Sequence, residues 1–355
     1  MSGVKTGHTR ITQLDGLRAC AILAVFLSHA FKIRMLWIGV DLFFVLSGFL
    51  ITGILVDLKH KDLKGYFSHF YERRVRRIGP PYVMVLIVAS LVFGTSWATH
   101  WYLYLGLTNY VVLFPGPPFM PFNPLWSLGV EEQFYLIWPF VVYFVSEKKL
   151  PYVLCSLLVL APVFRVLAIP YDTTHQMVYM GTPFRMDCLA MGSLLTFVWR
   201  AKGEVIRKYG YLGLIPVVLT PIVMMQLVKL GGFSTLEGTW KSNIFTYEIA
   251  LSAATGAFLW ALGGQYVGIL KTRLFQFLGR ISYTFYLIHL SALMLFERYV
   301  QNKGVIVLLA FVATISYATL SWYFLEKPIL AGGNRKAAWM EQAAATTTES
   351  SPTAR

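Results

Sequence analysis

The sequence predicts an all-α, polytopic membrane protein, and three observations lead to this fold class. Hydrophobic residues make up 56% of the 355 residues, whereas charged residues make up only 14%, well below the roughly 25% that is usual in soluble domains. Apolar runs long enough to cross a hydrocarbon core of about 30 Å recur along almost the whole chain. Because these runs are continuous rather than alternating, we expect helices, and not a closed barrel, to satisfy the backbone inside lipid.

About ten runs are expected to span the membrane. In chain order they occupy residues 13–31, 36–57, 80–97, 130–147, 150–168, 184–199, 209–228, 245–266, 281–297 and 304–325. The first run has basic flanks but no small-residue cleavage site, so we expect a retained helix and not a signal peptide. Residues 1–335 are expected to form one membrane domain, and residues 336–355, which are small and polar, a disordered tail.

The distribution of basic residues predicts the orientation. If the N-terminus is cytoplasmic, 22 of the 31 Lys and Arg residues lie on the inner side, six lie on the outer side and three fall within spans. Cytoplasmic loops collect positive charge, so we expect both termini in the cytoplasm. Anionic lipid of the inner leaflet accounts for the formal net charge of +14, and no nucleic-acid partner is expected.

Residues 98–129, between the third and fourth predicted spans, contain no Lys, Arg, Asp or Glu. They include the stretch FPGPPFMPFNPLW, which is too rich in proline for a regular helix. We expect an ordered outer cap or a re-entrant loop here.

The first predicted span carries two residues that resist burial in hydrocarbon, Arg18 and His29. Their spacing of eleven residues puts both on one helix face, about 16 Å apart along the axis. A charged residue at the bilayer centre costs about 2.5 to 3.5 kcal/mol, so such residues usually face a polar cavity or a partner. His29 also fits a helix-packing role, and Arg18 an anchor to lipid phosphates.

Asp41 is a candidate partner for His29. If the turn between the first two spans is centred near residue 35, the two residues lie at the same depth in an antiparallel hairpin. A carboxylate beside an imidazole fixes its tautomer and stabilises the imidazolium. The pair is therefore predicted to act as an oriented general base.

A cluster of arginines precedes the third span in the stretch YFSHFYERRVRRIGPPY. If this segment is helical, Arg73, Arg76 and Arg77 share one face. Guanidinium groups fork onto phosphates, so the cluster suits a nucleotide-bearing donor such as an acyl-CoA. The alternative is contact with lipid headgroups.

Two further islands carry acids at the start of a predicted span. Ser127 is placed as a helix N-cap with Glu131 and Glu132 following, although two adjacent acids exceed what capping needs. Arg185 and Asp187 lie at or just inside the outer boundary of the sixth span, where an interfacial pair is the plain interpretation.

The ninth predicted span contains Tyr283 and His289, and the tenth ends at Glu326. Tyr283 suits an aromatic belt, and His289 suits a hydrogen bond between two helices. No nucleophile elbow, phosphate loop or metal-spaced motif is present in the sequence.

Together these stretches resemble the integral membrane acyltransferase-3 family. The resemblance rests on LDGLRACAILAVFLSHAF, GVDLFFVLSGFLIT, FYERRVRRIGPPY, LWSLGVEEQFYLIWP, FRMDCLAMGSLL, LGRISYTFYLIHL and FLEKP, in family order. It implies a multi-pass enzyme of the bacterial inner membrane that moves an acyl group, often acetyl, from cytoplasmic acyl-CoA to a hydroxyl of a carbohydrate, lipid-linked glycan or secondary metabolite. It implies no bound cofactor and no metal, and we expect no fused hydrolase-like domain.

The resemblance also implies roles for residues. The family's arginine-x10-histidine signature falls on Arg18 and His29, and its double arginine falls on Arg73 and Arg74. Its acidic motif falls on Ser127, Glu131 and Glu132, and looser matches fall on Arg185, Asp187 and Tyr283.

In the mechanism we expect, the arginines hold the donor phosphates and His29, oriented by Asp41, takes the proton from the acceptor hydroxyl. Relay through an acylated Ser28 or Ser127 is an alternative. A transporter or flippase is the other class that intramembrane charges allow, and a membrane scaffold is a third. Release of thiol from acyl-CoA distinguishes the enzyme from both.

Overall fold

The computed structural model describes residues 11–113, 120–171, 176–229 and 239–332. The chain is 88% helical and has no strand among these residues, which confirms the all-α prediction. The ten longer helices are α1 (Gln13–Phe31), α2 (Ile38–Leu58), α3 (Leu63–Phe93), α5 (Leu125–Phe144), α6 (Leu150–Leu167), α8 (Thr182–Tyr209), α9 (Leu214–Lys229), α10 (Tyr247–Gly263), α11 (Arg273–Glu297) and α12 (Lys303–Ser321). The disordered tail predicted for residues 336–355 lies outside the described residues.

Within the described part of the chain, seven helical segments are long and apolar enough to cross a membrane. One of them, Gln176–Leu227, is 52 residues long and includes α7 (Gln176–Met180), α8 and most of α9. The helices α5 and α11 are not among the seven. The protein is therefore a multi-pass membrane protein, while the number of ten spans and the cytoplasmic location of both termini stay predictions.

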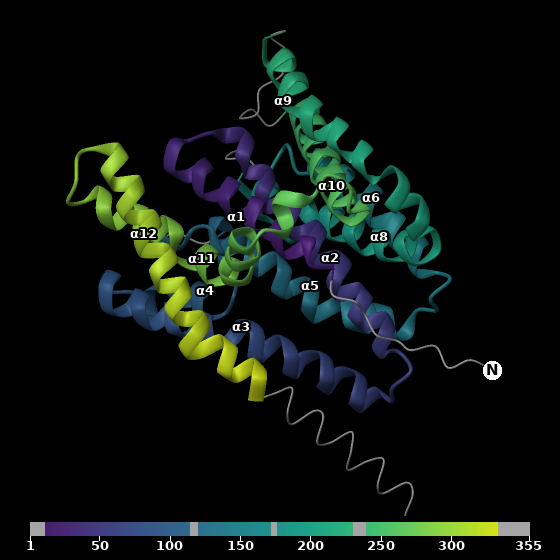
Figure 1. Cartoon of the computed structure of the whole chain (residues 1–355), viewed down its shortest axis with the longest axis horizontal. Coiled ribbons are helices and arrows are strands. Elements are labelled where there is room, and N and C mark those ends of the chain that lie inside the picture. Colours follow the sequence, from purple (N-terminus) through teal and green to yellow (C-terminus); the bar gives the residue numbers. More distant parts are fainter. Residues whose placement is uncertain (1–10, 114–119, 172–175, 230–238, 333–355) are drawn as a thin grey trace, which may run out of the picture.

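The helices form one bundle in which α1, α2, α5 and α11 occupy the middle (Figure 1). Helices α6, α8, α9 and α10 lie to one side of this centre, and α3 and α12 lie to the other. The α1 helix packs along α11 and against α2, and α2 packs along α8. The first hairpin of the chain therefore joins the two halves of the bundle.

Glycines set these two packing contacts at very short range. A Cβ atom at Gly192 of α8 would lie 2.0 Å from the carbonyl oxygen of Val45 on α2, and one at Gly279 of α11 would lie 1.8 Å from that of Asp15 on α1. Small residues allow membrane helices to approach backbone to backbone. These contacts fix which face of α1 turns to α11 and which face of α2 turns to α8.

The proline-rich segment is built from short helices: α4 (Trp97–Tyr104), η2 (Thr108–Leu113) and η3 (Met120–Phe122). Its buried side chains pack with those of α3 in a small apolar core. The Ser291 hydroxyl of α11 donates a 2.6 Å hydrogen bond to the Pro121 carbonyl. The described part is thus an ordered cap on α3 and α11; residues 114–119 lie outside the described residues.

Candidate active site

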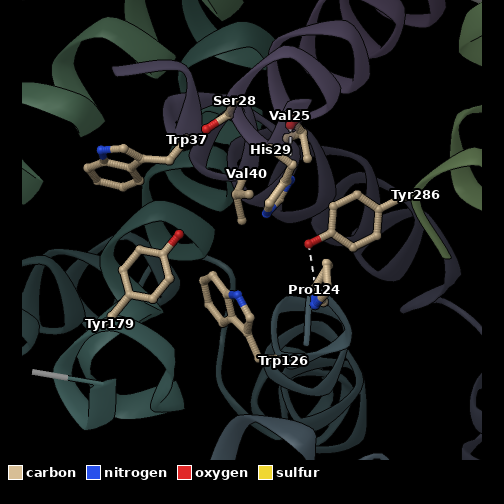
Figure 2. Close-up of a pocket in the computed structure, with 9 residues that line it drawn as sticks. All are labelled: Val25, Ser28, His29, Trp37, Val40, Pro124, Trp126, Tyr179 and Tyr286. Carbon is tan, nitrogen blue, oxygen red and sulfur yellow. Dashed lines mark hydrogen bonds between the residues drawn. The ribbon is translucent and has the colours of Figure 1, made fainter. Parts of the chain in front are cut away.

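A small pocket lies beside the C-terminal end of α1. About 310 Å³ of empty space, which includes open solvent at its mouth, is lined by Val25, Ser28, His29, Trp37, Val40, Pro124, Trp126, Tyr179 and Tyr286. Figure 2 shows the His29 ring projecting into this space, with the rings of Trp126, Tyr179 and Tyr286 around it. The pocket combines one imidazole with an aromatic wall.

His29 is anchored through a single ring nitrogen. Its Nδ1 lies 3.0 Å from the Val25 carbonyl oxygen, one turn earlier in α1, and 3.1 Å from Nε2 of His289 on α11. The expectation that His289 bridges two helices through a hydrogen bond is confirmed. The His29 side chain is exposed, whereas His289 is completely buried, so His29 is held on one side and accessible on the other.

The predicted contact between His29 and Asp41 is wrong. Asp41 lies in the first turn of α2 and forms a buried ion pair with Arg185 of α8, and its Oδ2 atom is buried without a hydrogen-bond partner. The physical reason is helix rotation: α2 packs along α8, while α1 packs along α11. Equal depth in a hairpin does not turn two side chains toward each other, so a catalytic role of Asp41 has no direct contact to support it.

Arg185 occupies a box of aromatic rings. Its Cζ atom lies 4.9 to 5.9 Å from the ring centroids of Trp37, Phe44, Trp126, Tyr179 and Tyr247. Three of these rings, those of Trp37, Trp126 and Tyr179, also line the pocket. The guanidinium is 1% exposed, so Arg185 supports the pocket wall from behind, and its contacts give no direct route to a substrate.

Asp187 pairs with a different helix. Its Oδ2 accepts a 2.6 Å hydrogen bond from Arg165 of α6, which also reaches Glu248 at 2.5 Å. Arg185 and Asp187 are each 1% exposed and have different partners, so the prediction that they pair with each other is wrong. The ion pair of Arg185 links α8 to α2, and the ion pair of Asp187 links α8 to α6.

The other end of α1 carries a group of positive charges. Arg18 donates a 3.0 Å hydrogen bond to Asp15 and retains 27% of its side-chain surface. Arg74 and Arg77 of α3 both lie within electrostatic reach of Arg18, and Arg74 also sits 6.0 Å from the ring centroid of Tyr135. We call Arg18, Arg74 and Arg77 the arginine cluster.

The double arginine of the sequence is split between two faces of α3. Arg73 is exposed and contacts His69 at 3.3 Å, and Arg76 pairs with an acid one turn away. Arg74 instead lies beside the Tyr135 ring of α5, and Arg77 lies 6.0 Å from the ring centroid of Trp322. Of the three residues predicted to share one face, Arg77 lies within electrostatic reach of Arg18, whereas Arg73 and Arg76 contact residues of their own helix.

Glu131 connects the arginine cluster to the middle of the bundle. Its carboxylate accepts hydrogen bonds from Ser47 of α2 at 3.0 Å and from Tyr135 at 2.7 Å. Arg18 and Arg74 interact favourably with this carboxylate. The role of Glu131 in substrate binding stays a prediction.

The prediction that Ser127 caps a helix is wrong. The α5 helix begins at Leu125 with Pro124 as its N-cap, so Ser127 lies within the first turn. Its hydroxyl donates to the Pro124 carbonyl at 3.3 Å and lies 2.6 Å from the hydroxyl of Tyr286, which lines the pocket. Ser127 therefore does not line the pocket itself and contacts it through the hydroxyl of Tyr286.

Tyr283 holds two helices together. Its hydroxyl donates a 3.1 Å hydrogen bond to the Ile78 carbonyl of α3, and it is not among the residues that line the pocket. No feature of the sequence assigned a substrate role to Tyr286, whereas Arg77 was placed with Arg73 and Arg76 in the candidate donor-binding cluster. The spacing of Arg77 three residues after Arg74 could have indicated the shared face, whereas the position of Tyr286 depends on packing between distant segments.

Comparisons with known proteins identify the family of the chain. The model of a family described as an acyltransferase domain matches residues 11–326. The chain belongs to this acyltransferase-3 family. Membership identifies the chain as an acyltransferase domain and favours an enzyme over a transporter. None of the solved structures matches the chain.

Several relatives have names that state an acetyl transfer. The "Peptidoglycan O-acetyltransferase OatA" of Listeria monocytogenes is 29% identical over 91% of this chain and 56% of its own length. The "Putative peptidoglycan O-acetyltransferase YrhL" of Bacillus subtilis is 32% identical over 93% of this chain and 57% of its own. A Staphylococcus aureus "Putative O-acetyltransferase" is 27% identical over 93% of this chain and 59% of its own. The chain spans somewhat more than half the length of these relatives, and together with the fold they support a membrane O-acyltransferase.

Proposed function

We propose that the protein transfers an acyl group, most simply acetyl, from cytoplasmic acyl-CoA to a carbohydrate hydroxyl at the bacterial inner membrane. The observation that carries this proposal is the placement of two different chemical groups along α1. The arginine cluster gathers around Arg18 at one end, and His29 opens into the aromatic pocket near the other end. The two residues are eleven positions apart, which is about 16 Å along a helix.

The arginine cluster suits the charged end of the donor. Coenzyme A carries phosphates, and Arg18, Arg74 and Arg77 can each offer a planar fork of N–H donors to them. A pantetheine arm that runs along α1 would bring the thioester toward His29. Neutral side chains of the pocket then surround the reacting carbonyl.

His29 supplies the base in the transfer step. Its exposed imidazole takes the proton of the acceptor hydroxyl while the hydroxyl oxygen attacks the thioester carbonyl carbon. The carbon–sulfur bond breaks, the coenzyme leaves as its thiolate, and the imidazolium returns the proton to that sulfur. The products are an ester and the free thiol, so no other reactant is needed.

The aromatic wall favours a carbohydrate acceptor. The rings of Trp37, Trp126 and Tyr179 offer flat apolar surfaces on which the C–H face of a sugar ring can stack. The relative from Listeria is named for peptidoglycan, and a cell-envelope glycan is the acceptor class that we propose to test first. Lipid-linked glycans and secondary metabolites are the remaining candidates.

The test uses the purified chain in lipid nanodiscs with acetyl-CoA labelled in its acetyl group. Free thiol is measured together with transfer of label to soluble peptidoglycan fragments, to a lipid-linked disaccharide and to water. We expect thiol release that rises with one of the two glycans and equals the label it receives. Acceptor uptake into vesicles without thiol release would contradict the proposal.

A further inference from the structure

Two imidazole rings meet where α1 crosses α11. Nδ1 of His29 and Nε2 of His289 are 3.1 Å apart, and the ring centroids are 5.0 Å apart with an interplanar angle of 51°. His289 is completely buried and is not part of the pocket lining, whereas His29 is exposed and lines the pocket. Only one of the two rings can therefore reach a substrate.

Backbone carbonyls determine where the ring protons lie. Nδ1 of His289 lies 2.7 Å from the carbonyl oxygen of Tyr286, and Nδ1 of His29 lies 3.0 Å from that of Val25. A carbonyl oxygen only accepts, so each Nδ1 must carry a proton. In a neutral ring the other nitrogen is then an acceptor. Nε2 of His289 consequently presents a lone pair to the Nδ1 proton of His29.

The same assignment determines the reactive nitrogen of His29. With its Nδ1 proton shared between the Val25 carbonyl and His289, the Nε2 atom of His29 holds the free lone pair. Figure 2 shows the ring projecting into the pocket. We infer that His289 is a positioning residue, which holds His29 in the tautomer and orientation that direct the basic Nε2 atom at the substrate. This inference rests on the proposed function, in which His29 is the base.

His289 can position His29 because its Nε2 atom, which carries no proton, can only accept a hydrogen bond from Nδ1 of His29. When His29 takes a proton on Nε2, its Nδ1 proton stays between the Val25 carbonyl and Nε2 of His289. Because the ring is now positively charged, both hydrogen bonds are charge-assisted and therefore stronger. His289 does not pass the proton onward, since its own Nδ1 already donates to a backbone carbonyl. The residue thus acts on the base and never on the substrate.

Three variants of His289 separate positioning from packing. In His289→Gln the side-chain oxygen reaches about as far as Nε2 and can accept from His29, whereas in His289→Asn the amide reaches only the Nδ1 position. We expect His289→Gln to keep most of the turnover and His289→Asn and His289→Leu to lose roughly 10- to 100-fold, as for a hydrogen bond to a charged group. The donor KM should change less than about two-fold in all three, because His289 does not line the pocket.

A second readout does not depend on turnover. The chain has seven histidines, and two-bond nitrogen–proton NMR of the ¹⁵N-histidine-labelled protein in nanodiscs distinguishes the two tautomers. The His29 signal is assigned by its loss in His29→Ala. We expect the Nδ1-protonated form in the wild type and in His289→Gln, and a mixture of tautomers in His289→Leu.

The two readouts separate failure of this inference from failure of the proposed function. A His29 tautomer that is Nε2-protonated in the wild type, or that is unchanged in His289→Leu, overturns the inference whatever the turnover. A parallel loss in His289→Gln and His289→Leu also overturns it, since packing alone would then explain both. Absence of thiol release from the wild type with the expected tautomers contradicts only the proposed function.

Discussion

The adjacent residues Arg73 and Arg74 have different surroundings, and this difference gives a test at the level of single residues. Arg74 turns toward Arg18 and lies 6.0 Å from the Tyr135 ring centroid, while Arg73 is exposed on another face of α3. We expect Arg74→Ala to raise the donor KM roughly 10- to 100-fold, since it loses a charge-assisted phosphate contact. Arg73→Ala is the matched control and should stay within about three-fold of the wild type.

Initial rates of thiol release at varied acetyl-CoA measure this prediction. An equal rise in donor KM for both variants would mean that Arg73 and Arg74 both bind the donor, as the sequence predicts. No rise for either variant would mean that these arginines contact lipid headgroups rather than the donor.

Asp41 and Arg185 are expected to affect folding more than chemistry. Breaking a buried pair by removing one charge typically costs about 3 to 5 kcal/mol, because the other charge is left unpaired. Asp41→Asn should therefore lower the thermal midpoint in nanodiscs, and the double variant Asp41→Asn with Arg185→Gln should recover part of the loss. Fluorescence-detected melting checks this. A fully stable Asp41→Asn protein with lost turnover would instead restore Asp41 as a catalytic group.

At the scale of elements, the contact of α2 with α8 depends on glycine. A Cβ atom at Gly48 would lie 2.1 Å from the Leu189 carbonyl oxygen, whereas one at Gly53, on the same helix, would meet nothing closer than 3.8 Å. We expect Gly48→Ala to lower the thermal midpoint and Gly53→Ala to leave it unchanged or raised, since alanine favours the helix by roughly 0.5 to 1 kcal/mol. Equal midpoints for the two variants would show that the backbones do not approach so closely.

The helix contacts also explain which parts of the site the sequence could predict. Arg18 and His29 fall on one helix because their spacing is a local property of α1. The partner of His29 depends on how α1, α2 and α11 are rotated about their axes, and glycines in distant segments determine that rotation. For the same reason the side chain of Asp41 was predicted on the wrong face of its helix. Ser127 was misplaced because a proline, and not the serine, precedes α5.

At the scale of the whole molecule, the all-helical class followed from composition and continuous apolar runs. The number of ten spans stays a prediction, because α5 and α11 are not among the seven described segments that are long and apolar enough to cross a membrane. Burial of charges such as Arg165 and Asp187 depends on partners from other helices. A hydropathy pattern does not show such partners.

The orientation of the bundle gives a prediction about the whole chain. With ten spans and cytoplasmic termini, reporters fused after residues 35, 115 and 235 should report the outer side, and those after residues 65 and 205 the inner side. Paired alkaline phosphatase and fluorescent-protein fusions measure this. A reversed pattern would place the arginine cluster outside, away from cytoplasmic acyl-CoA, and an odd number of crossings would contradict the ten-span assignment.

The proposed mechanism depends most on His29 as the base, and removal of this imidazole is its most direct test. His29→Ala is compared with the wild type and with His60→Ala, an exposed histidine after α2, for turnover and for equilibrium binding of acetyl-CoA in nanodiscs. A positioned general base contributes typically about 10² to 10⁴-fold, so we predict a loss of that size in His29→Ala, with donor binding unchanged and His60→Ala like the wild type. An inserted His29→Ala protein that acylates its acceptor at the wild-type rate would contradict the account.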